Sequence, residues 1–142
     1  MNFENNNILS ELKSKFGQQP FLTQQITKDG TFTIWIDKNF LVSVLKYLKN
    51  ETVLPYKMLF DLTCIDERTR INRNGQPDSD FTVVYHLTSF DRNEDLRIKV
   101  PLKINDLSIP SITNIWESAN WYEREVFDMF GIVFCGHPKL TR

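Results

Sequence analysis

The spacing of apolar residues predicts two helices in the first third of the chain. Apolar positions recur every three to four residues between Asn7 and Phe16, and Gly17 then ends the pattern. The same spacing returns after Asp37, a favourable N-cap residue, and continues to about Asn50. Each helix would therefore bury one stripe of apolar side chains and leave its other side in water.

Alternation of apolar and polar residues predicts five strands. Two of them flank Asp29-Gly30, a pair that is typical of a tight hairpin turn between β-prone runs. Another follows Pro55, and the last two are joined by a short turn at 91–94. The predicted strands are Phe21–Ile26, Thr31–Ile36, Lys57–Asp66, Phe81–Phe90 and Leu96–Ile104.

A third helix is predicted from Trp121 to Phe130. Asn120 can act as its N-cap, and Glu123 can reach back to the N-cap backbone as in a capping box. Gly131 follows the last helical residue and can adopt the left-handed conformation that closes a helix.

One side of this third helix is apolar, and the other side is polar but contains a tryptophan. A tryptophan beside an arginine is the composition of interface hot spots, whereas a polar helix face is often no more than a solvated surface. The residues alone leave both interpretations open. The predicted apolar side comprises Tyr122, Val126, Met129 and Phe130, and the polar side comprises Trp121, Arg124, Glu125 and Asp128.

The order of the elements, α-β-β-α-β-β-β-α, predicts an α+β fold. We expect two layers, with a mixed or antiparallel sheet of about five strands and the helices packed on one face. A length of 142 residues corresponds to a single domain, 1–142. The charged linker from Asp66 to Asp80 is predicted to be an exposed loop. Its Arg68, Arg70 and Arg73 alternate with acids, so we interpret them as a solvated loop tip and not as an anion site.

Composition places the chain among ordinary globular proteins. Hydrophobic residues make up 41% and charged residues 25%, and the net charge of -1 gives no electrostatic reason to expect a nucleic acid partner. No apolar run approaches the ~20 residues that span a bilayer, and the first residues do not resemble a signal peptide. The 2 cysteines fit a reducing compartment, so we expect an intracellular protein.

The residues predict no metal and no other cofactor. A zinc site would need Cys64, His86, Cys135 and His137 to converge, and the chain has no paired C-x-x-C unit. An iron–sulfur cluster usually needs four thiolates. His86 is interpreted as a sheet residue, because its own segment offers it no acid or thiol partner.

The C-terminal part of the chain resembles a known family. The run Glu123-Arg124-Glu125-x-x-Asp128-Met-Phe-Gly131-Ile-x-Phe134-x-Gly136-His137-Pro138-x-Leu140 is similar to the signature of the 30 kDa (C) subunit of respiratory complex I, the NADH:quinone oxidoreductase. The segment Leu59–Asp66 is similar to the central strand of that family, and the resemblance spans roughly Leu48 to Leu140. One position departs from the family, since Thr141 stands where an arginine usually follows the leucine.

The resemblance implies a non-catalytic, peripheral-arm subunit of a proton-translocating respiratory enzyme. Such a subunit lies on the cytoplasmic side of the membrane beside the 49 kDa (D) subunit, which helps to shape the quinone site, and it holds no flavin, cluster or metal. The resemblance favours the interface interpretation of Trp121, Arg124, Glu125 and Asp128. It leaves Glu123 as a helix cap and Gly131 as the helix end, and it makes Gly136-His137-Pro138 a rigid turn that presents His137 to a partner.

An alternative from another class is a small stand-alone hydrolase or metal enzyme. Glu125 and Asp128 are three apart on a helix and, with His137, could share a divalent ion. The missing nucleophile and the neutralising Arg124 argue against this alternative.

The end of the chain carries one more expectation. Members of the family continue into a charged tail or into a fused D subunit, so we expect this chain to lack such a portion. No helix or strand is predicted after Gly131, which would leave Ile132, Phe134 and Leu140 in an exposed apolar patch. Weak self-association through that patch is therefore expected.

Overall fold

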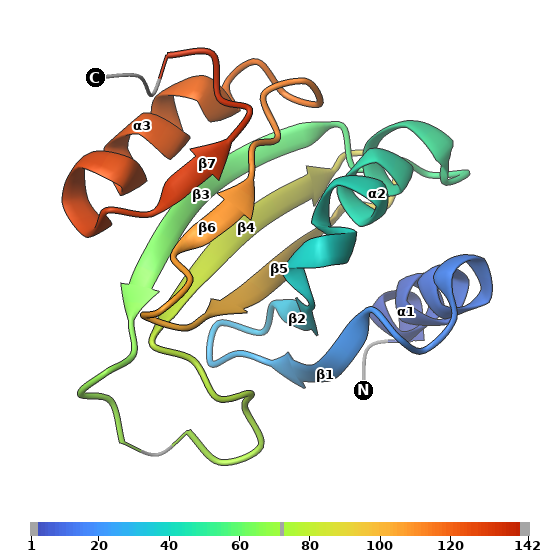
Figure 1. Cartoon of the computed structure of the whole chain (residues 1–142). Coiled ribbons are helices and arrows are strands. Elements are labelled where there is room, and N and C mark those ends of the chain that lie inside the picture. Colours follow the sequence, from blue (N-terminus) through green and yellow to red (C-terminus); the bar gives the residue numbers. More distant parts are fainter. Residues whose placement is uncertain (1–2, 72, 140–142) are drawn as a thin grey trace.

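The computed structural model describes residues 3–71 and 73–139 (Figure 1). The helices in these ranges are α1 (Phe3–Phe16), α2 (Leu41–Lys46) and α3 (Ala119–Phe130). A 3₁₀ turn at Lys38–Phe40 and a π-helical turn at Tyr47–Glu51 flank α2. The strands are β1 (Phe21–Ile26), β2 (Phe32–Ile36), β3 (Met58–Asp66), β4 (Phe81–Ser89), β5 (Glu94–Leu102), β6 (Ser108–Pro110) and β7 (Val133–Cys135).

Five of the strands form one mixed sheet in the order β1-β2-β5-β4-β3. The chain makes the β1–β2 hairpin, passes through α2 and then makes the β3–β4–β5 meander. Neighbours are antiparallel except β2 and β5, which run parallel and pair Ile34 with Ile98. The predicted α+β fold with a mixed sheet of five strands is confirmed.

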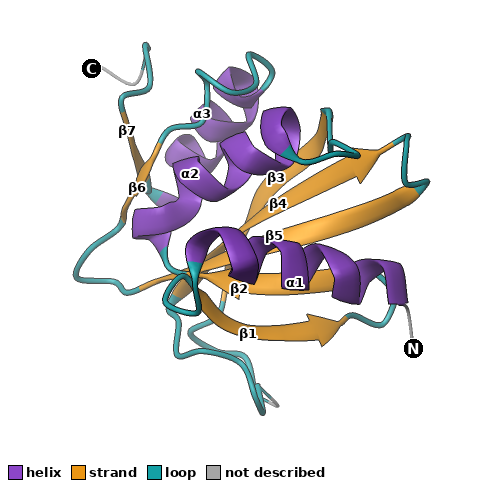
Figure 2. Cartoon of the chain, turned by 90° about the vertical axis from the view of Figure 1, so that its right-hand side faces the viewer, coloured by secondary structure: helices purple, strands orange, loops and turns teal. Residues whose placement is uncertain are grey.

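The helices lie on one face of the sheet (Figures 1 and 2). Successive residues of a strand point to opposite faces, so Tyr85 and Ile98 point toward the helices while Val84 and Lys99 point away. A single hydrophobic core fills the space between the two layers. It contains Ile8 and Leu12 of α1, Leu41, Val44 and Leu45 of α2, Ala119 and Val126 of α3, and strand residues such as Ile34, Val83, Tyr85 and Ile98.

The start of α3 differs from the prediction. The helix begins at Ala119, and Ser118 occupies the N-cap position without a side-chain cap bond, so Asn120 is not the N-cap. The backbone N–H groups of Ala119 and Asn120 donate instead to the carbonyls of Trp116 and Glu117. The carbonyls of the turn before the helix therefore accept hydrogen bonds from N–H groups that a capping side chain would otherwise bind. The prediction for Asp37 is confirmed, because its carboxylate accepts from the Asn39 N–H at 2.8 Å and caps the 3₁₀ turn.

The short strands β6 and β7 correct the prediction of an exposed C-terminal patch. They pair in parallel and place Ile109 beside Phe134. Ile132 and Phe134 are buried in the chain's own core, so neither of them contributes to an exposed apolar patch. Leu140, the third residue of the predicted patch, and Thr141, the position that departs from the family, lie outside the described residues.

Tyr85 provides a test of this core. Its side chain is fully buried, and its hydroxyl makes no hydrogen bond to any described residue. Burial raises the pKa of Tyr85 well above its usual value. We expect Tyr85→Phe to leave the free energy of unfolding unchanged or to raise it by about 1 kcal/mol. The variant no longer buries a hydroxyl whose lost hydration is not replaced by a hydrogen bond. Urea unfolding measures this difference.

A second buried tyrosine serves as the matched control. The Tyr56 hydroxyl donates to the Glu94 carboxylate at 2.6 Å, so Tyr56→Phe removes a real hydrogen bond. This variant is expected to lose about 1 kcal/mol. Equal losses in both variants would mean that the Tyr85 hydroxyl does have a partner.

Candidate functional site

The outward side of α3 carries the residues that the sequence singled out. We define the α3 outer face as Trp121, Arg124, Glu125, Asp128 and Met129, all of which are partly or fully exposed. Trp121 is 71% exposed and Met129 is 80% exposed. The predicted polar stripe is therefore confirmed, whereas the prediction that Met129 belongs to the buried side is wrong.

The reason for this difference lies in the inward side of α3. Val126 and Glu123 fill the contact with the core, and Phe130 packs edge to face against Phe81 with ring centroids 6.0 Å apart. These contacts set the rotation of the helix, which turns Met129 toward the solvent. The outer face thus combines two large apolar side chains with a cation and two acids.

Arg124 is held only loosely by its own chain. Its Nε lies 3.6 Å from the Asp128 carboxylate, and its Nη1 donates to the Lys139 carbonyl at 3.1 Å. The Arg124 and Asp128 side chains are both about half exposed or more, so this pair adds little to stability. Both charges remain accessible to another molecule.

Glu123 has a different role from the predicted one. Its carboxylate is buried and accepts from the Ser111 hydroxyl at 2.7 Å and from the Ile112 N–H at 2.8 Å. Burial raises the pKa of Glu123 above its usual value. The capping-box prediction is wrong, because α3 begins at Ala119 and Glu123 already lies a full turn inside the helix. Glu123 instead ties α3 to the chain that follows β6.

His137 also points inward. Its Nδ1 accepts from the Lys139 N–H at 2.9 Å, so its Nε2 carries the proton and donates to the Asn120 carbonyl at 3.0 Å. The predicted turn does exist, since Gly136 adopts φ 89 and the His137 N–H donates to the Phe134 carbonyl. The prediction that His137 is presented to a partner is wrong, because the ring serves to hold the turn against α3. Pro138 of this turn is exposed.

The predicted end of α3 is confirmed. Gly131 adopts φ 75, and its N–H donates to the Phe127 carbonyl at 2.9 Å. This left-handed closure turns the chain directly into β7.

The residues of the alternative metal enzyme do not come together. Glu125 and Asp128 lie on the outer face of α3, whereas His137 is buried against the helix. Across residues 3–71 and 73–139, the structure contains no group of three or more His, Cys, Asp and Glu side chains placed to hold a metal ion. His86 has a partner after all, because its Nε2 lies 3.2 Å from Asp95 on the neighbouring strand.

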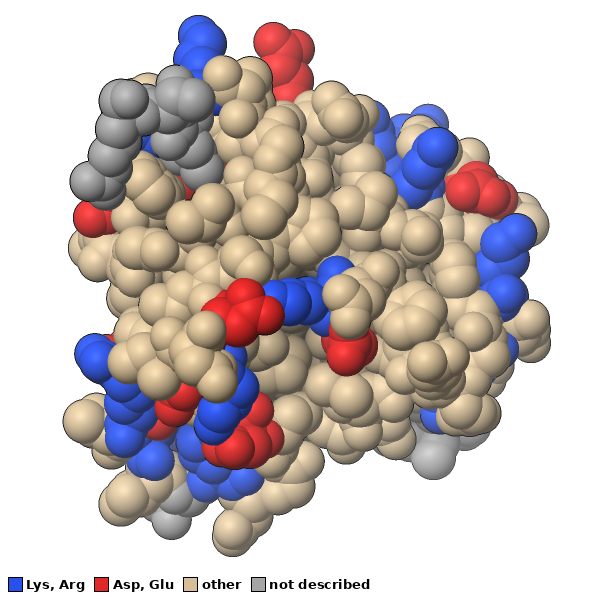
Figure 3. All heavy atoms as spheres, in the orientation of Figure 1, with Lys and Arg blue, Asp and Glu red and all other residues tan. Residues whose placement is uncertain are grey.

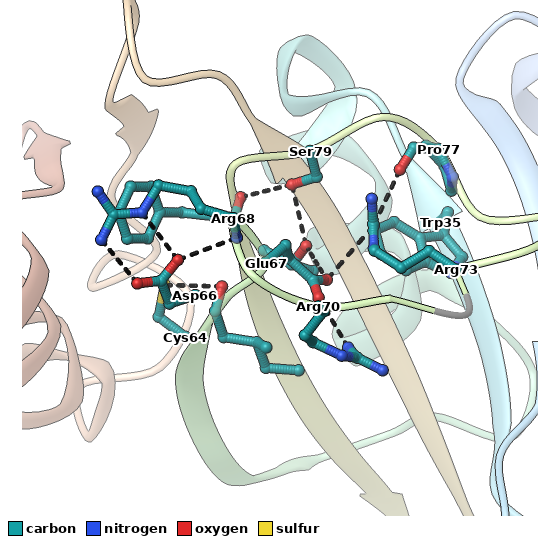
Figure 4. A network of polar contacts seen from close by, with 12 residues as sticks. Trp35, Cys64, Asp66, Glu67, Arg68, Arg70, Arg73, Pro77 and Ser79 are labelled. Atoms are coloured by element: carbon teal, nitrogen blue, oxygen red, sulfur yellow. Dashed lines mark hydrogen bonds and ion pairs between the residues drawn. The ribbon is translucent and has the colours of Figure 1, made fainter.

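The linker between β3 and β4 contains a charged cluster that was misinterpreted from the sequence. Glu67 is buried and accepts from the Thr82 hydroxyl at 2.6 Å and from the Arg70 guanidinium at 2.7 Å. Arg73 lies 3.4 Å from the same carboxylate and also donates to the Pro77 carbonyl (Figure 4). The interpretation as a solvated loop tip is therefore wrong for Arg73, which shares the buried Glu67 carboxylate, whereas Arg68 and Arg70 are exposed as expected.

A signal for this network was present in the sequence. Thr82 lies on the face of β4 that points away from the helices, where a small polar side chain fits an ion network. Glu67 follows directly on β3, with Arg70 three residues later. In Figure 3 a dense group of positive and negative side chains lies at the lower left, where Figure 1 places this linker.

None of the described helices is long and apolar enough to cross a bilayer. The sequence model of the family described as "Respiratory-chain NADH dehydrogenase, 30 Kd subunit" matches residues 34–142.

Several relatives of this chain are named as the C/D subunit of NADH-quinone oxidoreductase. The protein of Nitrosospira multiformis is 53% identical over 142 residues, covering 95% of this chain and 23% of the relative. That of Acidiphilium cryptum is 53% identical over 135 residues, with coverage of 95% and 23%. That of Psychrobacter sp. is 55% identical over 135 residues, with coverage of 95% and 22%. The chain thus spans less than a quarter of the length of these relatives.

Two solved structures share the fold. A trypsin-resistant fragment of Nqo5 aligns with a TM-score of 0.74 and 25% identity, covering 95% of this chain and 98% of the fragment. A chain of the membrane-bound sulfane sulfur reductase, an archaeal respiratory membrane complex, aligns with a TM-score of 0.72 and 18% identity, with coverage of 96% and 73%. At 18% identity the second alignment bears on the fold alone.

Proposed function

Because this chain belongs to the 30 kDa subunit family of the respiratory-chain NADH dehydrogenase, we propose that it is a non-catalytic subunit in the peripheral arm of a proton-translocating NADH:quinone oxidoreductase. In this role the chain supplies a docking surface, and other subunits carry the redox centres. It associates with the cytoplasmic side of the membrane through the complex.

The proposed partner is the D (49 kDa) subunit. The relatives are named as C/D subunits, and this chain corresponds to 22–23% of their length. Joining two parts in one chain keeps them at a high effective concentration, which favours contact between them. The relatives' names therefore support a direct contact between this domain and the D portion.

The observation that carries the proposal is the α3 outer face. Trp121 and Met129 expose large apolar surfaces to water. Covering these surfaces with a partner would be favourable, because it removes apolar area from water. Tryptophan and arginine are among the residues most enriched in interface hot spots, and Arg124 lies beside Trp121 on this face. The acids Glu125 and Asp128 add charge that orients a partner.

The test is truncation of Trp121 in the protein as it occurs in its native cell. Trp121→Ala is expected to weaken the interface by about 2 kcal/mol or more, roughly thirtyfold in affinity. The amount of intact membrane complex and its NADH:quinone activity should fall together. The isolated domain should melt within about 2 °C of the unchanged protein, because Trp121 is exposed.

Phe90 is the matched control. It is an aromatic residue that is 73% exposed, and it follows β4 directly and is not part of α3. Phe90→Ala should leave complex assembly unchanged. If the Trp121→Ala variant assembled normally, α3 would not be the docking surface. NADH oxidation by the pure domain would contradict a non-catalytic role.

A further inference from the structure

The face of the sheet that points away from the helices carries a cleft with an unusual charge balance. The cleft has a volume of about 560 Å³ and lies between β1, β5 and the linker that follows β3. Its described lining includes the cations Lys28, Arg70 and Lys99 and no carboxylate. A second cavity of about 240 Å³ adjoins it, since Lys99 lines both, and contributes Arg97 and His86 together with Asp61.

Lys99 lies at the centre of this face. It is only 7% exposed, and its ammonium group lies 5.3 Å from the centre of the Trp35 ring. Within the described residues its ammonium, which lines the cleft, makes no hydrogen bond and no ion pair, although a lysine with so little exposed surface usually has a carboxylate partner. Burial, together with the nearby Arg70, Arg97 and Arg73, lowers the pKa of Lys99, against the opposing effect of Glu67.

Two acids close to the cleft, Glu67 and Asp29, are already engaged by cations, and Asp61 of the adjoining cavity accepts from the Leu62 N–H. Glu67 accepts from Arg70, Arg73 and Thr82. Asp29 is bound by the Arg97 guanidinium at 2.6 Å, and this contact with Arg97 holds the pKa of Asp29 well below its usual range. The cleft therefore retains an excess of positive charge that these acids do not cancel.

We propose that this cleft is a second docking site, which takes a carboxylate side chain from an acidic segment of a partner protein and places it beside Lys99. The charge of the lining selects an acid. The exposed side chain of Ile26 on the cleft wall favours a protein segment over a small anion, because a segment covers apolar surface as well. The net charge of -1 gives no long-range attraction for nucleic acid or an anionic membrane.

This docking site is separate from the α3 outer face. Lys99 points to the side of the sheet opposite the core, whereas Val126 of α3 belongs to that core. The inference therefore goes beyond the proposed function and is tested without it.

The experiment uses the isolated chain and two synthetic peptides. One is acetyl-Glu-Ile-Glu-Ile-Glu-amide, and the other has glutamine in place of each glutamate. We expect the acidic peptide to bind and to shift the NMR signals of the Lys99 side chain, with an affinity at least about tenfold above that of the glutamine peptide. Equal binding of both peptides would overturn the proposal.

Variants of two cleft residues and one distant lysine complete the design. Lys99→Met removes the charge beside Trp35 but keeps an unbranched side chain, and it should weaken binding by about tenfold. Lys28→Gln, at an exposed position, should weaken binding by about threefold. Lys46→Met removes the same charge from α2 and should change nothing. Because Lys28 is exposed, its variant tests the site even if Lys99→Met fails to fold.

Two further probes separate the other sources of negative charge. Inorganic phosphate and vesicles with anionic lipid headgroups are offered at the same concentration of charge as the acidic peptide. Neither is expected to compete with the peptide. Displacement of the peptide by phosphate alone would make the cleft a small-anion site, and binding to the vesicles would make it a membrane contact, so either result would overturn the proposal.

Discussion

Replacing Glu67 by alanine is expected to lower the free energy of unfolding by about 3–5 kcal/mol. The Glu67 carboxylate has no exposed surface and is bound by Thr82, Arg70 and Arg73. The Arg73 side chain is only 15% exposed, so it would lose the acid that balances its charge in a place that water scarcely reaches. Breaking one member of a buried ion network is costly for this reason, even though surface ion pairs contribute little.

Thermal unfolding of the variants measures this effect. Glu67→Ala should melt at least about 10 °C below the unchanged protein. Asp78→Ala is the control in the same linker, because the Asp78 side chain is 85% exposed and pairs with Lys103 on the surface. That control should change the free energy of unfolding by about 0.5 kcal/mol or less. Comparable losses in the two variants would refute the buried network.

Replacing Glu123 by alanine is the second large effect, with an expected loss of about 2–4 kcal/mol. The change leaves the buried Ile112 N–H without its acceptor and opens a cavity under α3. Glu123→Gln should cost far less, because its carbonyl can still accept from Ile112 and its amide can donate to the Ser111 hydroxyl. Urea unfolding of both variants separates the hydrogen bonds from the charge.

The pH dependence of the same variants tests the charge itself. Burial, the largest cause, raises the pKa of Glu123 above its usual 4.5, and the hydrogen bonds from Ile112 and Ser111 oppose that rise. The folded state therefore binds more protons than the unfolded state between these two values. The contribution of Glu123 to stability is complete below pH 4.5 and declines as the pH rises through the raised pKa.

Glu123→Gln lacks this titration. The stability of the unchanged protein minus that of Glu123→Gln should fall as the pH rises from about 4 to about 7. A difference that grows over this range would mean that the folded protein favours the charged carboxylate.

Periodicity was a good guide where a long element has one buried face. Alternation located β4, in which Val83 and Tyr85 point to the core, and β3 between Pro55 and the charged linker. Helical spacing identified α3 and its exposed Trp121. These predictions were correct because the spacing of apolar residues along an element follows from which of its faces is buried.

Periodicity could not find contacts between segments that are far apart in sequence. The partners of Glu123 are Ser111 and Ile112, which precede α3 by a whole turn-rich connection. The three-residue strand β7 is too short to display alternation, and its pairing with β6 exists only after α3 has reversed the chain. A short window of sequence therefore shows neither the partners of Glu123 nor the pairing of β7 with β6.

Charge patterns were the least reliable guide. Glu67, Arg70 and Arg73 looked like solvated residues because charged linkers usually are. Arg70 is indeed exposed, whereas the burial of Glu67 and Arg73 depends on Thr82 of β4 and on the Trp35 ring, whose centre lies 6.0 Å from the Arg73 guanidinium. His137 was misjudged for a similar reason, because the backbone of Asn120 decides which way its ring turns.

The parallel pairing of β2 with β5 also determines the order in which the sheet can form. The strands β3, β4 and β5 follow one another along the chain, so their antiparallel pairing closes comparatively short loops. Phe32 of β2 pairs with Leu96 of β5, and bringing them together closes a much longer stretch of chain, which is slower. On a ribosome, the hairpin that is synthesised first therefore waits for the last strand of the meander. During that interval the backbone groups along the β5 side of β2 remain unpaired, and an open strand edge of this kind makes the nascent N-terminal half a natural client for a chaperone.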